Sequence, residues 1–509
     1  MNSIFLKITV ILFFAIIPAG SAQEGQPGTK LEPKAKEVNL VNLKKLGYLT
    51  ARRSEKIFGS PWGIEFNAIP PHVNHPISEI DMASLGPEID RRLEKAAELG
   101  VKWARVSVSW TSVEDDNGRF RWDFLDQVIS GLKERGIQPY ICINGGHPVH
   151  TEKLPPTVSE KGLKAWLRMT ETLVQRYKEE VSYWEIWNEP NYSGFWKPEP
   201  DPAAYVKLVQ EGSRLIKAIQ PDATVIGGSL ARLDAVFAKD LFDLGIAKDI
   251  DVLSYHPYDE IPESTAKKRA VSVITPEWYL PSSHQVQRLQ EIVAESDEDI
   301  KIWQGECGYG SAAHTQGWQG NGPWGENIQA KWLLRRALTD LGSGMEVSAY
   351  FILHEYEMGS GVNYKGLLEL ESGKEKPAFT AYQSLTSLVD NTFDLKPNTS
   401  GIFSINDQGI FYGIKAEDIQ TMSLRKNEGQ DIFLYWLPWR AQELVEPAMV
   451  NLSLQGLDIQ DPVLVNLLTG EVYEPSSKET NSGGLKLEEL PVFDFPVAIV
   501  SENSIHISE

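Results

Sequence analysis

The chain has few cysteines and few basic residues for its length. Only two of its 509 residues are cysteine, Cys142 and Cys307. An exported protein could join them in a disulfide, but each lies in or just after an expected core strand, so we favour two buried thiols. Lysine and arginine number 49 against 70 aspartates and glutamates, which gives a formal net charge of -21. This acidity argues against nucleic acid and anionic membranes as partners, because both are negatively charged.

A long apolar run is also missing after the N-terminus. Residues 8–17 form a short apolar core behind Lys7, and P-A-G-S-A follows at residues 18–22. A core of this length is too short to span a bilayer and is typical of a secretory signal peptide cleaved before Gln23. We therefore expect residues 1–22 to be a signal peptide and the mature protein to be secreted or periplasmic, with no insertion into a membrane.

The spacing of the histidines lacks the common metal-hydrolase motifs. The nine histidines contain no H-x-H or H-E-x-x-H arrangement, and such spacings are what place two imidazoles on one metal ion. A metal-dependent hydrolase that uses His147, His150, His256 and His354 is therefore the weakest alternative. We expect neither a metal nor another cofactor.

What the sequence does contain is a regular alternation of strand-like and helix-like segments over residues 58–389. The expected strands are residues 62–67, 103–110, 139–144, 181–187, 224–229, 251–256, 300–306 and 347–353. A helical pattern follows each of them, such as residues 88–99, which stop at Gly100 in the manner of a C-capped helix. Eight strand–helix units are the count for a (β/α)8 TIM barrel, an α/β fold.

The segments on either side of this region have different patterns. Residues 23–57 are polar and contain several glycines and prolines, so we expect a flexible leader or linker. After residue 389 the helical pattern stops, and short apolar runs at residues 432–436, 463–468, 485–487 and 497–500 are separated by turn residues. Such runs are typical of strands, and residues 390–509 are therefore predicted to form a small, sandwich-like all-β domain.

The stretch V-S-Y-W-E-I-W-N-E-P-N at residues 181–191 ends the fourth expected strand on a carboxylate. Its first seven residues are largely β-branched, aromatic or apolar, as in a buried strand. Pro190 cannot donate to a sheet ladder and biases Glu189 toward an extended conformation. Glu189 is thereby delivered to the C-terminal end of a barrel strand, where this fold places its chemistry. The alternative is a strand-ending glutamate that only faces solvent.

A second carboxylate, Glu306, ends the seventh expected strand within W-Q-G-E-C-G. Both glutamates should project into the same mouth of the barrel. Glycoside hydrolysis needs two carboxyl groups beside the scissile bond, and in the retaining form of the reaction they lie ~5–5.5 Å apart. One of them must hold a proton and the other must stay ionised. The pair therefore predicts a hydrolase of glycosidic bonds.

These residues resemble glycoside hydrolase clan A, the TIM-barrel retaining glycosidases. The motif E-I-W-N-E-P-N is most similar to glycoside hydrolase family 39, with family 5 close behind. The resemblance implies Glu189 as the general acid/base and Glu306 as the nucleophile. It also implies that Asn188 hydrogen-bonds the sugar 2-hydroxyl and that Arg105 is the basic residue near the nucleophile. The alternative for Arg105 is a structural ion pair.

Further candidates for contacts with the sugar come from other strand ends. By the same resemblance, His256 and Tyr258 match the sixth-strand position that supports the nucleophile, with core packing as the alternative. Glu65, Asn144 and His147 end other strands and are candidates for binding sugar hydroxyls. Trp318 belongs to the glycine-rich loop after the seventh strand, where an aromatic ring would suit the apolar face of a pyranose. The alternative for each is a packing or loop role.

Together these features predict a secreted retaining glycoside hydrolase that acts on β-glycosidic bonds of an oligo- or polysaccharide by double displacement. Resemblance to family 39 points first to an exo-acting, β-xylosidase-like enzyme. An endo-acting β-glycanase on the same barrel is the first alternative. A carbohydrate-binding pseudoenzyme is the second, and the presence of both glutamates counts against it. Turnover of an activated aryl glycoside separates a catalyst from a binding protein.

Overall fold

The structure is a computed structural model that describes residues 43–69, 80–152, 154–258, 262–263, 282–312, 324–358, 361–396, 399–426, 430–443, 445–481 and 484–509. All of them belong to one compact unit, Leu40–Glu509. The expected signal peptide at residues 1–22 and Trp318 lie outside the described residues. None of the described helices is both long enough and apolar enough to cross a membrane.

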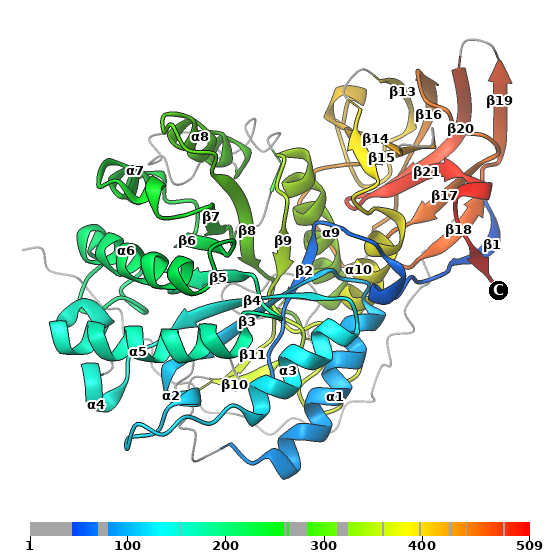
Figure 1. Ribbon diagram of the computed structural model, residues 1–509. Coiled ribbons are helices and arrows are strands. Elements are labelled where there is room, and N and C mark those ends of the chain that lie inside the picture. Colours follow the sequence, from blue (N-terminus) through cyan, green and yellow to red (C-terminus); the bar gives the residue numbers. More distant parts are fainter. Residues whose placement is uncertain are drawn as a thin grey trace, which may run out of the picture. The chain divides into compact units, whose positions relative to one another are not determined.

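Eight parallel strands close into a barrel, as the alternating sequence pattern predicts (Figure 1). The strands pair in the order of the sequence, and the last one, β9, pairs with the first one, β2, to complete the ring. The barrel strands are β2 (Trp62–Glu65), β3 (Trp103–Ser109), β4 (Gln138–Asn144), β5 (Tyr183–Ile186), β6 (Thr224–Ala231), β7 (Val252–His256), β8 (Lys301–Cys307) and β9 (Ser348–Tyr350). Each overlaps one of the ranges predicted from the sequence.

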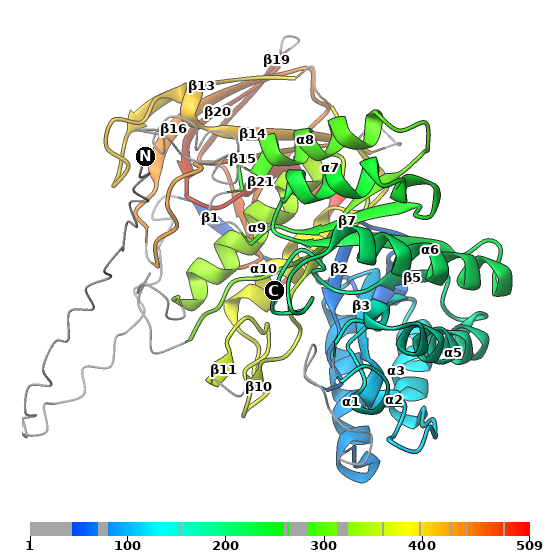
Figure 2. The same ribbon diagram turned by 90° about the vertical axis from the view of Figure 1, so that its left-hand side faces the viewer.

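Helices alternate with these strands and lie on the outside of the barrel (Figures 1 and 2). They are α1 (Met82–Glu98), α2 (Trp110–Val113), α3 (Asp123–Glu134), α4 (Pro148–Thr151), α5 (Glu160–Tyr177), α6 (Pro202–Ile219), α7 (Ala235–Asp243), α8 (Ser282–Ala294), α9 (Glu326–Gly342) and α10 (Pro377–Leu388). Local signals set their ends. The side chain of Asp201 caps α6 by accepting from the Ala204 N–H. Gly100, just after α1, has a φ of 73°, a left-handed conformation that glycine adopts without strain.

The interior of the barrel changes character along its axis. Near the starts of the strands it is filled by an apolar cluster of Tyr140, Ile226, Val252, Trp303 and Val347. Toward the C-terminal ends the inward side chains are charged, and Arg105 of β3 and Glu185 of β5 are both completely buried. The apolar layer closes the barrel from below, so the charged layer can be reached only from the C-terminal mouth, where Glu189 and Glu306 lie.

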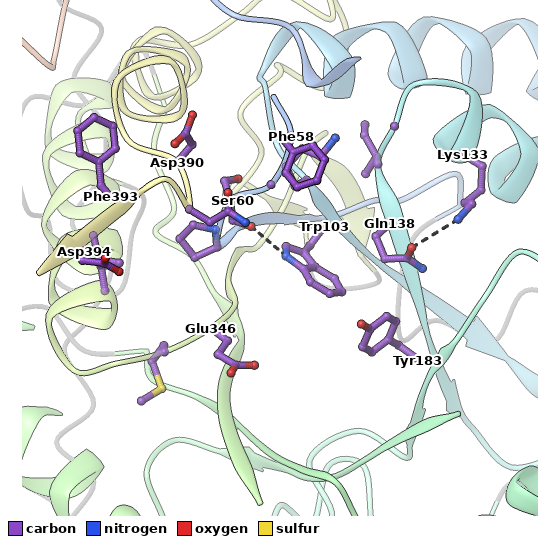
Figure 3. A pocket seen from close by; sticks show the side chains of 18 residues that line it. Phe58, Ser60, Trp103, Lys133, Gln138, Tyr183, Glu346, Asp390, Phe393 and Asp394 are labelled. Atoms are coloured by element: carbon purple, nitrogen blue, oxygen red, sulfur yellow. Dashed lines mark hydrogen bonds between the residues drawn. The ribbon is translucent and has the colours of Figure 1, made fainter. Parts of the chain in front are cut away.

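A cavity of about 670 Å³ opens at the opposite, N-terminal ends of the strands. Its lining includes Phe58 and the side chains of Trp103, Gln138 and Tyr183 from β3, β4 and β5 (Figure 3). The indole N–H of Trp103 already donates to the Ser60 carbonyl at 3.0 Å. This cavity contains neither of the two candidate catalytic glutamates, and it is separate from the site described below.

The chain after α10 forms two antiparallel sheets, as predicted for an all-β domain. In sheet order the first contains β12 (Phe393–Leu395), β14 (Gln420–Lys426), β15 (Asp431–Trp436), β21 (Val497–Ser501), β17 (Pro462–Asn466), β18 (Glu471–Glu474), β1 (Lys44–Leu49) and β22 (Ile507–Ser508). The second contains β13 (Ser400–Asp407), β16 (Ala448–Gln455), β20 (Gly484–Val492) and β19 (Ser477–Asn481). Phe403, Phe433, Leu452, Leu487 and Ile499 belong to one core shared by the two sheets, which therefore form a sandwich.

Strand β1 departs from the prediction that residues 23–57 form a flexible leader. It pairs antiparallel with β18 on one side and with β22 on the other, so the last part of the expected linker is a strand of the C-terminal sheet. Its sequence K-K-L-G-Y-L has one buried position, Gly47. With so little burial the segment lacks the apolar alternation by which a strand is recognised in a sequence.

Buried ion pairs connect α9 with the sandwich. Arg335 donates to the two carboxylate oxygens of Glu263, in the connection between β7 and α8, at 2.5 and 2.7 Å. Trp436 of β15 donates to the same carboxylate at 2.9 Å. Lys331 of α9 pairs with Asp494 of the sandwich at 2.8 Å, and their side chains are 2% and 0% exposed. The barrel and the sandwich thus share charged contacts from which water is almost completely excluded.

Candidate active site

Glu189 lies just beyond the end of β5, on a backbone with an unusual conformation. Trp187 and Glu189 have φ angles of 71° and 48°, which non-glycine residues adopt only where surrounding contacts hold them. The Glu189 N–H donates to the Ser229 carbonyl of β6 at 2.9 Å, which anchors this turn to the neighbouring strand. Glu189 is 9% exposed, so its carboxyl group is largely withdrawn from solvent.

Glu306 lies near the end of β8 and faces Glu189. One of its oxygens accepts from the Arg105 guanidinium at 2.8 Å, and the other accepts from the Tyr258 hydroxyl. One carboxylate oxygen of Glu189, one carboxylate oxygen of Glu306 and one ring nitrogen of His256 all lie within 4.8 Å of one another. The two carboxylates predicted from strand ends therefore do meet at one site.

His256, at the end of β7, lies between the two carboxylates. Its Nδ1 is 3.1 Å from a Glu189 oxygen and 3.9 Å from a Glu306 oxygen. The ring is completely buried, so its position is fixed. With Tyr258 bonded to Glu306, both residues predicted from the sixth strand contact the pair.

Arg105 lies at the centre of the hydrogen-bond network of the site, because all five N–H groups of its guanidinium have acceptors. They point to Glu185 (2.6 Å), Glu65 (3.1 Å), Glu306 (2.8 Å), Cys142 (3.2 Å) and Asn188 (2.9 Å). Five donors are the full complement of an arginine side chain. Burial alone would lower the pKa of Arg105, but the surrounding carboxylates raise that pKa well above its usual value. The guanidinium is therefore a permanent cation beneath the pair.

Asn188 is held so that one end of its amide is free. Its Oδ1 accepts from Arg105 at 2.9 Å, while its buried Nδ2 has no hydrogen-bond partner among the described residues. A buried donor without a partner is costly and usually has a functional reason. The arrangement suits the hydrogen bond to a sugar hydroxyl that the motif predicts for this residue.

The structure gives the other expected sugar-binding residues partners inside the protein. Glu65 is 1% exposed and bonds to Arg105. The His147 ring lies 3.2 Å from the Glu114 carbonyl and accepts from the Val149 N–H as the cap of α4. Asn144 is 6% exposed, and its amide is 3.8 Å from the Cys142 sulfur. Each of these three side chains is thus buried against a partner within the protein, and Trp318 lies outside the described residues.

Two residues of the site were not predicted from the sequence. Glu185 of β5 accepts from Arg105 with one oxygen and from the Ser229 hydroxyl with the other, at 2.6 Å each. The sequence signal that could have revealed Glu185 is a charged residue within a strand whose other residues are typical of a buried strand. Lys365 follows β11 (Gly361–Asn363), and its Nζ lies 5.3 Å from the centre of the Tyr258 ring. Burial lowers the pKa of Lys365, against the opposing charge of Glu306.

The cluster of Glu189, His256 and Glu306 also contains ligand types that metals use. The Arg105 cation and the Tyr258 hydroxyl already bond to Glu306, and a fixed positive charge at this distance opposes a second cation. We therefore interpret the cluster as a carboxylate pair bridged by an imidazole. Cys142 and Cys307 are both buried and are not joined in a disulfide, as predicted.

Comparisons with known proteins agree with this architecture. The solved structure of a family 39 glycoside hydrolase from the gut symbiont Bacteroides cellulosilyticus WH2 is similar, with 18% identity, a TM-score of 0.64 and coverage of 89% of this chain and 83% of that chain. A monomeric β-xylosidase from Caulobacter crescentus CB15 has 17% identity, a TM-score of 0.52 and coverage of 89% and 97%. At these identities the likeness shows the shared fold.

Sequence comparisons identify the family. A β-xylosidase of Geobacillus stearothermophilus is 24% identical over 155 residues, which are 27% of this chain and 31% of that protein. The match thus spans less than a third of that relative. The model of "Glycosyl hydrolases family 39" matches residues 90–393, which is more than half of the 509 residues. The protein therefore belongs to glycosyl hydrolases family 39 and is a glycoside hydrolase.

Proposed function

We propose that the protein is a retaining enzyme that hydrolyses β-glycosidic bonds of oligo- or polysaccharides by double displacement. The closeness of the two carboxylates carries this proposal, because one oxygen of Glu189 and one oxygen of Glu306 lie within 4.8 Å of each other. Retaining glycosidases hold their carboxyl groups ~5–5.5 Å apart, whereas inverting enzymes need ~6.5–9.5 Å to admit a water molecule. The spacing therefore supports direct attack by one carboxylate on the sugar.

The hydrogen bonds of the two carboxylates support different roles for them. Glu306 accepts from a permanent cation and from a hydroxyl, and both bonds favour its ionised form. An ionised carboxylate is the nucleophile that the reaction needs. Glu189 has the imidazole of His256 as its partner, with no cation bonded to it among the described residues. It is the better candidate to hold a proton and then return it.

In the first step, a Glu306 oxygen attacks the anomeric carbon while the bond from that carbon to the leaving oxygen breaks. Glu189 gives its proton to the leaving oxygen. In the second step, Glu189 takes a proton from water, and the water oxygen attacks the anomeric carbon as Glu306 departs. The free amide of Asn188 can donate to a hydroxyl beside the reacting carbon in both steps.

The substrate class is an inference from the relatives. Two of them are named as β-xylosidases, which supports β-xylosides as the first substrates to examine and favours exo action over the endo alternative. The N-terminal pattern at residues 1–22 supports secretion or export to the periplasm. Aryl β-xylosides and xylo-oligosaccharides should be assayed first, and the anomer first released should be identified by proton NMR.

Substitution of the two glutamates tests the assignment of roles. Glu306→Ala should abolish turnover of every substrate, because no covalent intermediate can then form. Glu189→Ala should retain the first step with an activated phenol leaving group and should accumulate the intermediate. On natural substrates the loss should be ~10²–10⁴-fold, the usual contribution of general acid–base catalysis. Added azide should speed turnover of Glu189→Ala and yield a β-glycosyl azide.

An α-glycosyl azide from Glu189→Ala, or near-normal activity of Glu306→Ala, would contradict the assignment. Glu114→Gln serves as the matched control. Glu114 is also completely buried, but its carboxylate bonds to Arg168 and His150, outside the carboxylate pair. Its substitution should leave the dependence on the leaving group unchanged.

A further inference from the structure

Three carboxylates compete for the single guanidinium of Arg105. Glu306, Glu65 and Glu185 all accept hydrogen bonds from it, and only Glu306 has a role in the proposed reaction. The bond from Arg105 Nε to Glu185 is the shortest of the three, at 2.6 Å, and both side chains are 0% exposed. Glu185 therefore has the closest contact with the cation on which Glu306 depends.

Glu185 is also fixed from its other side. Its second oxygen accepts from the Ser229 hydroxyl at 2.6 Å, and Ser229 has a φ of 44° at an irregularity in the pairing of β6 with β7. With both oxygens bonded, the carboxylate cannot turn away from Arg105. The guanidinium is in turn held in the plane that presents its Nη1 to Glu306.

A negative charge on Glu185 opposes a negative charge on Glu306. Interactions between charges are strong where water is excluded, and one guanidinium cannot fully neutralise three carboxylates. An ionised Glu185 therefore takes part of the stabilisation that Arg105 would otherwise give to Glu306. It also repels Glu306 directly.

We infer that Glu185 is a positioning residue that orients Arg105 and shares its charge, and thereby sets the pH above which Glu306 can act as nucleophile. This inference rests on the role proposed for Glu306. It adds to the reaction a carboxylate that does not touch the substrate.

Other charged or titratable groups face these two carboxylates from the surrounding elements. Around Glu306 they are Arg105, Tyr258, His256, Glu189, Glu65, Cys307, Tyr356 and Lys365. Around Glu185 they are Arg105, Cys142, Tyr140, Tyr205 and His256, whose Nε2 lies beside Gly305 together with a Glu185 oxygen. Burial raises the pKa values of Tyr140 and Cys142 well above the usual range, so both stay neutral. A change at Glu185 is therefore transmitted mainly through Arg105.

The variant Glu185→Gln separates charge from shape. Its amide oxygen can still accept from Arg105, and its amide N–H can donate to the Ser229 oxygen. The readout is the rate of inactivation by a 2,4-dinitrophenyl 2-deoxy-2-fluoro-β-xyloside, measured as a function of pH. Dinitrophenolate departs without help from an acid, so the acidic limb of this profile reports the ionisation of the nucleophile. We expect this limb to move to lower pH by about one unit.

Two comparisons make this outcome decisive. Glu114→Gln, the neutral variant of a buried carboxylate outside the hydrogen-bond network of Arg105, should leave the acidic limb of the pH profile unchanged. Ser229→Ala keeps the Glu185 carboxylate but removes one of its two hydrogen bonds, so it should shift the acidic limb in the same direction by a smaller amount. It is the variant to test if Glu185→Gln does not fold. A folded variant whose limb is unmoved, or moves to higher pH, would overturn the inference. Inactivation of Glu306→Ala by the probe would instead refute the role of Glu306 itself.

Discussion

At the scale of single residues, His354 should make the stability of the fold depend on pH. Its ring lies after β9, is 3% exposed, and has its Nδ1 2.6 Å from the Glu355 carbonyl. Burial, together with the positive charge of Arg92, lowers the pKa of His354 to about 4. An unfolded chain takes up a proton on this histidine near pH 6.5, whereas the folded protein does so only near pH 4.

The unfolded state therefore binds more protons between these two values, so stability must fall as the pH decreases through this window. A difference of one pKa unit corresponds to about 1.4 kcal/mol, so the full contribution of His354 to the free energy of unfolding is about 3 kcal/mol. His354→Gln should flatten the pH dependence of thermal unfolding between pH 6.5 and 4, as followed by circular dichroism. His506→Gln, a change at an exposed histidine, is the control. An unchanged slope in His354→Gln would contradict the assignment.

At the scale of elements, strand β1 should be an integral part of the C-terminal sheet. It lies between β18 and β22 and provides backbone pairing to both, so its loss exposes two strand edges. Its ion pairs from Lys44 and Lys45 to Glu474 and Glu471 are largely exposed and contribute little. A chain that begins at Thr50 should unfold several degrees lower and aggregate more readily than one that begins at Leu43.

Differential scanning calorimetry and light scattering would measure this difference. Equal midpoints for the two chains would show that the sheet is complete without β1. The chain that begins at Leu43 retains the strand, and it should match the full-length protein if the residues before Leu43 contribute no stability.

The elements also explain which parts of the structure were predictable from the sequence. The barrel strands are buried on both sides and read as apolar runs, and the helices between them have apolar faces with clear end signals, so each unit could be recognised from local sequence. Strand β1 lacks that pattern, and its partner β18 is more than 400 residues away. Pairing at such a distance is not encoded in neighbouring residues.

The same distinction between local patterns and long-range contacts applies to the residues of the active site. Glu189 and Glu306 were predictable because each ends a recognisable strand of a known motif. Glu185 was missed although it lies on β5, the strand that Glu189 follows, because its role depends on Arg105 from another strand. Trp184, the residue before Glu185 in the motif, points outward and donates to Gln220 at 2.9 Å, as the alternation of side chains along a strand requires.

At the scale of the whole molecule, the ion pairs of α9 should stabilise the barrel and the sandwich together. Removing one partner of a buried pair leaves an uncompensated charge, at a cost of about 3–5 kcal/mol. Arg335→Ala would leave Glu263 without its cation, so we expect thermal unfolding several degrees below that of the unsubstituted protein. Arg288→Ala breaks a pair with Glu291 in which both side chains are about half exposed, and it should change the midpoint little. Equal effects of the two changes would show that burial adds nothing to the Arg335 contact.

The position of β1 also has a consequence for how the protein acquires its structure during synthesis. Residues 44–49 leave the ribosome before any part of the barrel, yet their partners in β18 and β22 leave it only after the whole barrel. The strand must wait, unpaired, while more than 400 further residues emerge. This sheet can therefore close only after the barrel has been translated. Pairing of β1 with β18 and β22 is therefore a late event of folding.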